Sequence, residues 1–364
     1  MTETKTAQLR PRQAVERMGE YHPPLAGRDG LLRLDFNENT SAPSPRVLER
    51  LRSLSTLELT KYPEREPAEH IVAKHFGFPP DQVMLTNGVD EAIHLLTSTF
   101  LDPGDEVIIA TPTFAMYDIQ AQAAGATIHR IASGRDFAFP FAAVMQQITE
   151  RTRFIPIASP NNPTGAVVSR DHILAIAAAA PQAVILADEA YYHFHGETVL
   201  RAVATVPNLF VARTFSKVYG LAGLRLGVIF GPPDPMRFLR KAASPYNVNA
   251  AALACVQPAL EDEAYVRWYV EEIHYSRALL ETALVELDVP HWPSHSNYIL
   301  MDIGDRFQEL IDRMRSRGVL LRSRNTDPGC ARCVRMSVGT REDTQQGITA
   351  LRATLKEMQW QKPK

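Results

Sequence analysis

Short apolar runs alternate with amphipathic segments along the middle of the chain. The apolar runs fall at residues 83–86, 106–110, 154–158, 183–187 and 209–212. Helical spacing of apolar positions marks residues 90–100, and an alanine-rich segment at 173–180 is also typical of a helix. Strands that alternate with helices predict an α/β domain with a mainly parallel sheet. The run at 183–187 is wholly apolar, which indicates a strand buried on both faces.

The pattern changes beyond Pro245. Residues 250–260 and 265–285 have the spacing of helices that connect two lobes. Further strands are predicted at 297–301 and 333–339, and further helices at 307–317 and 342–358. At the other end, a polar arm of about 30 residues precedes a short strand at 31–36 and a helix at 45–54. We therefore expect an N-terminal arm with part of a small domain at 1–50, a large domain at 51–250, and a small C-terminal domain at 251–364.

Composition and charge narrow the class of protein. Of the 364 residues, 45% are hydrophobic and 22% are charged, as is usual for a soluble globular protein. The net charge of -2 provides no electrostatic attraction to nucleic acid or to an anionic membrane. No apolar run approaches the roughly 18 residues of a membrane helix, and the polar N-terminus does not resemble a signal peptide. Three cysteines make no disulfide framework and suit a reducing compartment, so we expect a cytoplasmic protein.

Candidate chemistry gathers after the strand predicted at 209–212. Thr214, Ser216 and Lys217 follow it, and Arg225 lies eight residues beyond Lys217. Burial disfavours the charged form of a lysine and lowers its pKa, which makes the lysine a nucleophile that forms a Schiff base with an aldehyde. The two hydroxyls and the arginine are donors for a phosphate. An aldehyde and a phosphate in one ligand describe pyridoxal phosphate (PLP).

The strand predicted at 183–187 leads to a second candidate, Asp188. Ligands of open α/β sheets collect at the carboxyl ends of the strands. A carboxylate at this depth needs a cationic partner, and the protonated pyridine nitrogen of PLP is such a partner. Because the next apolar strand leads to Lys217, we expect both side chains to point into one crevice.

Three segments together resemble a known family. They are Ser-Pro-Asn-Asn-Pro-Thr-Gly at 159–165, Asp-Glu-Ala-Tyr at 188–191, and Thr-Phe-Ser-Lys at 214–217 with Arg225. In order and spacing they are similar to the signature of the fold-type-I PLP aminotransferases of class I and II. The resemblance implies a large domain with a mainly parallel sheet of the seven-stranded type. It also implies a smaller α+β domain from the N-terminal arm and the C-terminal third, and a homodimer with its sites at the subunit interface.

The resemblance assigns roles to individual residues. It implies that Lys217 is the catalytic residue and that PLP is held by a larger set: Val89, Asp90, Phe114, Asn162, Asp188, Tyr191, Thr214, Ser216, Lys217, Arg225 and, from the partner subunit, Tyr62. Within this set, Phe114 stacks on the pyridine ring, while Asn162 and Tyr191 donate to the 3′ oxygen. The turn at Asn87 and Gly88 is compatible with phosphate binding, because the amides at the start of the following helix face outward. It is equally a common turn, so the phosphate assignment rests on the resemblance.

Within the family, the chain is most similar to the histidinol-phosphate aminotransferases. That likeness implies exchange of an amino group between histidinol phosphate and 2-oxoglutarate, with Arg322, Arg335 and Tyr21 at the substrate. Aromatic aminotransferases and threonine-phosphate decarboxylases share the same cofactor residues, so the amino donor stays open. A PLP-dependent regulator would need a DNA-binding module, which we do not expect, and a nicotinamide dehydrogenase would need a G-x-G-x-x-G turn after a strand.

Two further motifs have no assigned role. His193 and His195 alternate along the chain but have no acidic or cysteine ligand beside them, so we interpret them as loop or surface residues. Cys330 and Cys333 have the spacing of a metal or redox pair, but no second ligand pair accompanies them. We therefore expect no metal site.

Overall fold

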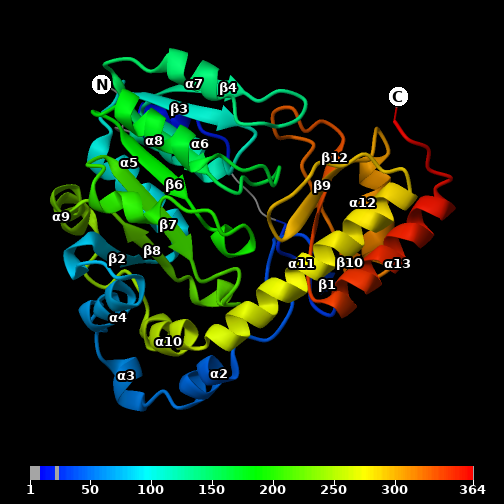
Figure 1. Cartoon of the computed structure of the whole chain (residues 1–364), viewed down its shortest axis with the longest axis horizontal. Helices are drawn as coiled ribbons and strands as arrows, with labels where there is room; N and C mark the ends of the chain where they lie inside the picture. The colour runs from blue at the N-terminus through cyan, green and yellow to red at the C-terminus, as the bar shows by residue number, and fades with distance from the viewer. Residues whose placement is uncertain (1–8, 21–23, 364) are drawn as a thin grey trace, which may run out of the picture.

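The computed structural model describes residues 9–20 and 24–363. The larger lobe is built around a seven-stranded sheet (Figure 1). In order across the sheet, the strands are β2 (Val83–Thr86), β8 (Gly227–Phe230), β7 (Leu209–Thr214), β6 (Val184–Asp188), β5 (Thr152–Ala158), β3 (Glu106–Thr111) and β4 (Thr127–Ala132). Only β8 runs against its neighbours, β2 and β7, while the other pairs are parallel. The predicted α/β class and the mainly parallel sheet are confirmed.

Helices cover both faces of this sheet, because its central strands are apolar on both sides. One face packs against α5 (Gly88–Phe100), α6 (Ala115–Ala124) and α9 (Pro233–Ala242). The other packs against α4 (Glu66–Phe76), α7 (Phe141–Gln147) and α8 (Arg170–Ala179), and α10 (Ala250–Glu261) packs against α4. Successive side chains of β6 point to opposite faces of the sheet. Val184 and Leu186 pack on the face that carries α5, α6 and α9, and Ile185 and Ala187 pack on the opposite face. The next side chain, Asp188, therefore points toward α6.

The smaller lobe combines distant parts of the chain (Figure 1). Its antiparallel sheet has the order β11 (Arg322–Ser323), β12 (Cys333–Ser337), β9 (Tyr298–Asp302). A second pair joins β1 (Leu32–Arg33) in parallel to β10 (Val319–Leu320), which ties the N-terminal segment to the C-terminal third. Three helices pack with these strands: α11 (Glu263–Glu286), α12 (Phe307–Ser316) and α13 (Arg341–Glu357). The division near residues 50 and 250 stays a prediction.

The remaining elements are short. They are α1 (Gln13–Glu16), α2 (Pro45–Arg52), α3 (Thr56–Thr60) and the 3-10 turns η1 (Pro80–Gln82), η2 (Tyr192–Phe194), η3 (Leu200–Ala204) and η4 (Ala222–Leu224). The N-terminal region differs from expectation in two details. Helix α1 packs against α6, so part of the polar arm is a packed element. A strand is present within the range predicted at 31–36, but it has only two residues because only they pair with β10. No helix in the described residues has the length and apolar character to cross a membrane.

Candidate active site

The candidate residues meet at the carboxyl edge of the large sheet. Asp188 is the last residue of β6, and Thr214 is the last residue of β7, the neighbouring parallel strand. Lys217 follows three residues later, and the loop that carries Asn162 follows β5 on the other side of β6. Asp188 and Lys217 thus follow neighbouring parallel strands, and the expectation that both side chains point into one crevice stays a prediction.

Asp188 is a buried carboxylate held by neutral donors. The Tyr117 hydroxyl donates to Oδ2 at 2.6 Å, and the Ala190 amide donates to Oδ1 at 3.0 Å. Burial raises the pKa of Asp188 to about 6, although these two hydrogen bonds act in the opposite direction. No lysine or arginine among the described residues forms an ion pair with Asp188. A cationic ligand atom at this position would therefore supply the missing partner.

A second group of candidates surrounds the start of helix α5. Gly227 of β8 lies opposite Thr86 on one side and Thr214 on the other, so it brings the turn before α5 beside the Ser216 loop. A Cβ on Gly227 would lie 2.7 Å from the carbonyl carbon of Gly88, so only glycine permits this approach. Arg225 closes over Gly88 and forms a half-exposed ion pair with Asp90 at 2.9 Å. Helix amides, hydroxyls and a guanidinium thus converge, as an anion requires.

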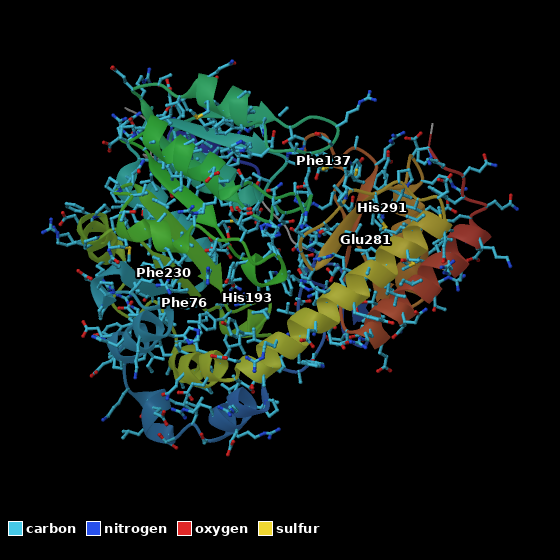
Figure 2. All side chains as sticks on the ribbon, in the orientation of Figure 1. Phe76, Phe137, His193, Phe230, Glu281 and His291 are labelled. Carbon is cyan, nitrogen blue, oxygen red and sulfur yellow. The ribbon has the colours of Figure 1, made fainter. Side chains whose placement is uncertain are left out.

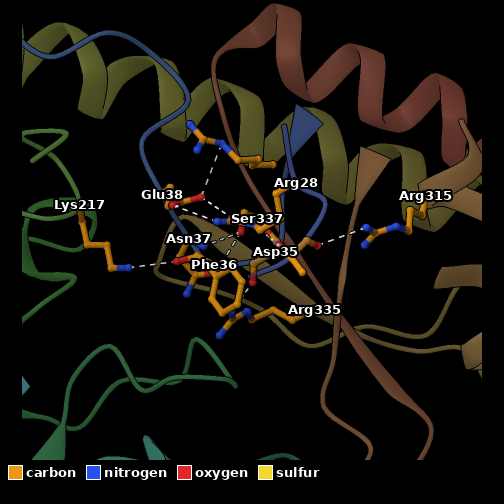
Figure 3. A network of polar contacts seen from close by, with 11 residues as sticks. Arg28, Asp35, Phe36, Asn37, Glu38, Lys217, Arg315, Arg335 and Ser337 are labelled. Carbon is orange, nitrogen blue, oxygen red and sulfur yellow. Dashed lines mark hydrogen bonds and ion pairs between the residues drawn. The ribbon is translucent and has the colours of Figure 1, made fainter. Parts of the chain in front are cut away.

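Lys217 faces the N-terminal segment of the small lobe (Figure 3). Its Nζ donates to the backbone carbonyl of Phe36 at 3.1 Å and lies 5.6 Å from the centre of the Tyr191 ring. The Tyr191 hydroxyl in turn accepts a hydrogen bond from Asn37 Nδ2 at 2.9 Å. Lys217 and Tyr191 therefore share one polar site between the two lobes.

Arg335 reaches into the same region from β12. It is 3% exposed, donates to the Asp35 carbonyl at 2.7 Å and to Asn162 Oδ1, and lies over the Tyr298 ring. Burial, followed by the nearby charge of Arg324, lowers the pKa of Arg335 to about 10. Among the described residues no carboxylate forms an ion pair with Arg335. A buried guanidinium bonded to neutral acceptors alone is suited to an anionic ligand.

Arg322 lies beside Arg335 as the small sheet dictates. The two residues are directly opposite each other in the pairing of β11 with β12, so their side chains share one face. Arg322 is 5.0 Å from the centre of the Phe36 ring, and Arg28 is 4.6 Å from the same ring. The two arginines predicted to bind substrate are thus brought together.

The remaining predicted residues are less tightly clustered. Phe114 precedes α6 and contacts Tyr117 edge to face at a centroid distance of 5.8 Å, which places it next to the partner of Asp188. Tyr62 is 77% exposed and stacks on Tyr246 at the surface of the chain. Tyr21 lies outside the described residues.

The interpretation of His193 as a loop or surface residue agrees with its place in a short turn, although its ring is partly buried. It lies in η2, on the side of the large lobe that carries Phe76 (Figure 2), and packs edge to face on Tyr219. Burial lowers the pKa of His193 to about 3, so the ring is neutral. His195 is also partly buried and packs against His295 at 4.8 Å.

Both cysteines of the Cys-x-x-Cys segment are buried, in a cluster with Phe137, Leu300 and Trp292. The hydrogen bond to Cys333, together with burial, raises the pKa of the Cys330 thiol. A high pKa and burial make a thiol unreactive. Within the part of the chain that the structure describes, no group of three histidine, cysteine or acidic side chains could hold a metal ion.

Sequence reasoning missed two polar residues near the site, Tyr117 and Arg324. Tyr117 lies three residues past Phe114, so a tyrosine one helical turn beyond a strand end was its only signal. Arg324 follows Arg322 at the two-residue spacing of a strand, and this alternation places it toward the same face. Asn37 belongs to an Asn-Glu-Asn turn at 37–39 that resembles the family's N-terminal segment near the active site, but no local pattern indicates its long-range hydrogen bonds.

These features place the protein among the fold-type-I, PLP-dependent enzymes. The described residues fit the cofactor: Asp188 lacks a cationic partner, the start of α5 lies close to Arg225 in an arrangement suited to a phosphate, and Lys217 follows β7, the strand that pairs with β6. Within that class, the chain belongs to the aminotransferases of class I and II, whose family model matches residues 29–351.

Individual relatives agree with this family. The histidinol-phosphate aminotransferase of Dehalococcoides mccartyi strain BAV1 is 34% identical over 325 residues, which cover 88% of this chain and 89% of the relative. The enzyme of the same name from Methanocella arvoryzae is 33% identical over 358 residues, covering 92% and 95% of the two chains. The chain therefore shares nearly its whole length with aminotransferases.

Solved structures agree on the fold. The histidinol-phosphate aminotransferase of Sinorhizobium meliloti, crystallised with pyridoxal-5′-phosphate, superposes with a TM-score of 0.87 at 21% identity and covers 97% of this chain and 99% of its own. A Thermus thermophilus aspartate aminotransferase mutant superposes with a TM-score of 0.80 at 22% identity, covering 96% and 100%. At this identity the likeness shows the fold alone.

Proposed function

We propose that the protein is a cytoplasmic homodimer that transfers the amino group of histidinol phosphate to 2-oxoglutarate, with PLP as cofactor, in histidine biosynthesis. The products are imidazole acetol phosphate and glutamate. The observation that carries the proposal is the pair Arg322 and Arg335, opposite each other on one face of the small sheet beside the Lys217 site. The names of the relatives at 34% and 33% identity support the same substrate.

The proposed roles are those that the family resemblance implies for the residues around Lys217. When bound, PLP supplies an electron sink and carries the amino group between the two substrates. Asp188 holds a positive charge on the pyridine nitrogen, while Val89, Asp90, Thr214, Ser216 and Arg225 bind the phosphate. Phe114 packs on the ring, and Asn162 and Tyr191 donate to the 3′ oxygen. Lys217 Nζ moves the proton at the reacting carbon of the substrate.

The two arginines account for the use of two unlike substrates. A guanidinium presents two parallel donors that fit a carboxylate or a phosphate. Arg335 would bind the phosphate ester of the donor in one half-reaction and a carboxylate of 2-oxoglutarate in the other. A phosphate has more charge and more acceptor oxygens than a carboxylate, so it gains more from Arg322. Tyr21 would add a hydroxyl to this site.

A panel of amino donors tests the proposed function. The PLP-loaded enzyme would be given 2-oxoglutarate with histidinol phosphate, phenylalanine, tyrosine or threonine phosphate, and the products identified by mass. We expect the highest kcat/KM with histidinol phosphate. Preference for an aromatic donor would indicate an aromatic aminotransferase, and release of carbon dioxide from threonine phosphate would indicate a decarboxylase.

Substitution of the arginines is expected to separate the two anions. Arg322→Ala should lower kcat/KM for histidinol phosphate by roughly tenfold or more relative to phenylalanine, because a lost charge-assisted hydrogen bond is worth about 1.5–3 kcal/mol. Arg335→Lys should weaken both donors, since a lysine cannot replace a bidentate guanidinium. Steady-state kinetics with both donors would measure the difference. Equal losses for both donors with Arg322→Ala would contradict the phosphate assignment.

Tyr62 is expected to act in the site of the partner subunit. It is exposed on its own subunit, where it stacks on Tyr246, and Pro63 favours an extended backbone before it. Lys217→Ala and Tyr62→Phe chains, each of low activity alone, would be mixed, and the heterodimers isolated by two different tags. A heterodimer should regain activity, because one of its two sites is then built from intact residues. Heterodimers no more active than the parent variants would exclude a shared site.

A further inference from the structure

Asn37 lies in a buried hydrogen-bond network with Ser337 (Figure 3). The same side chain contacts Tyr191. Its side-chain Nδ2 donates to the Tyr191 hydroxyl at 2.9 Å, and its backbone amide donates to Ser337 Oγ at 2.9 Å. The Ser337 hydroxyl donates to Asn37 Oδ1 at 3.0 Å, and Asn297 Nδ2 donates to the Asn37 carbonyl at 3.2 Å. Asn37 is 1% exposed, and Ser337 and Asn297 are wholly buried.

The backbone amide of Asn37 determines the direction of the hydrogen bonds between Asn37, Ser337 and Tyr191. Because the backbone amide of Asn37 can only donate, Ser337 Oγ must accept there, and its own proton is left for Asn37 Oδ1. The Asn37 amide is thereby oriented with its NH2 group toward Tyr191. The Tyr191 oxygen accepts this bond, so the single hydroxyl proton must point elsewhere.

The backbone at Asn37 supports the same arrangement. Its φ of 55° lies in the left-handed region, which asparagine enters more easily than most residues. The bonds from Ser337 and Asn297 hold this conformation from β12 and from the residue before β9. The orientation of the Asn37 amide is therefore determined by the small lobe, whereas Tyr191 belongs to the large lobe.

We propose that Asn37 is a positioning residue that directs the hydroxyl proton of Tyr191 toward the 3′ oxygen of the bound cofactor, and that Ser337 fixes Asn37 in the orientation this requires. The inference rests on the proposed use of PLP. A hydrogen-bond donor at the 3′ oxygen weakens the attraction between that oxygen and the proton on Lys217 Nζ, the nitrogen of the Schiff base with the cofactor. Asn37 thus lowers the pH at which the bound cofactor loses this proton.

The test follows the visible absorbance of the PLP-loaded enzyme as a function of pH. Four proteins form a cycle: wild type, Asn37→Gly, Tyr191→Phe and the double variant. Glycine is used because it adopts the positive φ without strain. We expect Asn37→Gly to raise the apparent pKa of the bound cofactor, read from its absorbance, by about half a unit to one unit. A shift of this size corresponds to the free energy of one hydrogen bond. In the Tyr191→Phe background, the same substitution should cause no further rise.

Asn37→Asp is the second variant, because aspartate keeps the shape and also tolerates positive φ. Its carboxylate presents an acceptor to Tyr191 and would draw the proton away from the cofactor, so the apparent pKa should rise at least as far as with glycine. Ser337→Ala should raise it less, since the amide can then turn either way. None of these changes removes the titratable and charged groups that face Tyr191, which are Lys217, Tyr298, Arg335 and Tyr117.

Asn39→Ala is the matched control from the same segment. Asn39 donates to the Val218 carbonyl and to the Tyr265 hydroxyl, and it does not touch Tyr191. Its titration should match that of the wild type. An unchanged pKa in Asn37→Gly and Asn37→Asp, or an equal rise in both backgrounds of the cycle, would overturn the inference while leaving the proposed function intact. A wild type that binds no PLP would instead overturn the proposed function, and the inference with it.

Discussion

Lys217→Ala is expected to lower the rate of transamination by about 10³-fold or more, because it removes the group that moves the proton at the reacting carbon. Proton transfer by a positioned side chain contributes about 10²–10⁴-fold to an enzymatic rate. In the structure, Lys217 Nζ is held by the Phe36 carbonyl at 3.1 Å and faces the Tyr191 ring, just past the end of β7, the strand that pairs with β6. Arginine would keep the positive charge without the nucleophilic amine, so Lys217→Arg should be as inactive as Lys217→Ala.

A chemical measurement accompanies the kinetics. Borohydride reduction of the PLP-loaded wild type, followed by peptide mapping, should place the pyridoxyl group on Lys217. The control is Lys241→Ala, because Lys241 lies on the outer helix α9 beside Phe238. That variant should label and turn over like the wild type. A pyridoxyl group on any other lysine would contradict the assignment.

The central strands were predictable because burial on both faces leaves a continuous apolar run. All five residues of β6 and all six of β7 are buried, and the sequence places both strands within two residues of their observed ends. Strand β4 is different: it lies at the edge of the sheet, where its residues are exposed or only partly buried, so no apolar run marks it. Strand β8 has only four residues and runs against its neighbours, which the repeating strand-and-helix pattern does not indicate.

The site residues also differ in how far local sequence determines their position. Asp188 and Lys217 directly follow apolar strands, so local sequence and the geometry of a parallel sheet suffice to bring them together. Tyr117 reaches Asp188 across 71 positions of the chain, and Asn37 reaches Ser337 across 300. Such contacts depend on how helices and lobes pack, and no periodicity within one segment encodes them.

Asp188→Asn is expected to reduce transamination on the order of 10²-fold, because a neutral amide cannot hold the positive charge on the pyridine nitrogen. The substitution preserves the shape of the side chain. The Tyr117 hydroxyl, which donates to Asp188 at 2.6 Å, can accept from the new amide instead. PLP should still bind, since the start of α5, Ser216 and Arg225 are unchanged. Steady-state kinetics and absorbance of the bound cofactor would measure both effects, and turnover near the wild-type rate would exclude Asp188 as the partner of the ring.

The same substitution is expected to stabilise the PLP-free protein, and the effect should depend on pH. Burial raises the pKa of Asp188 from 3.8 to about 6, so the folded state holds this proton more tightly than the unfolded state does. As the pH rises between these two pKa values, the free energy of unfolding falls by up to about 3 kcal/mol, and above the higher value the folded state holds an unpaired buried charge. Asparagine has no such charge. Without PLP, Asp188→Asn should therefore unfold at a higher temperature than the wild type at pH 8, with a smaller difference at pH 5. With PLP bound, the order should reverse, because the pyridine nitrogen then neutralises Asp188 and has no partner in the variant. An equal difference at both pH values without PLP would show that Asp188 is not the buried charge that the cofactor neutralises.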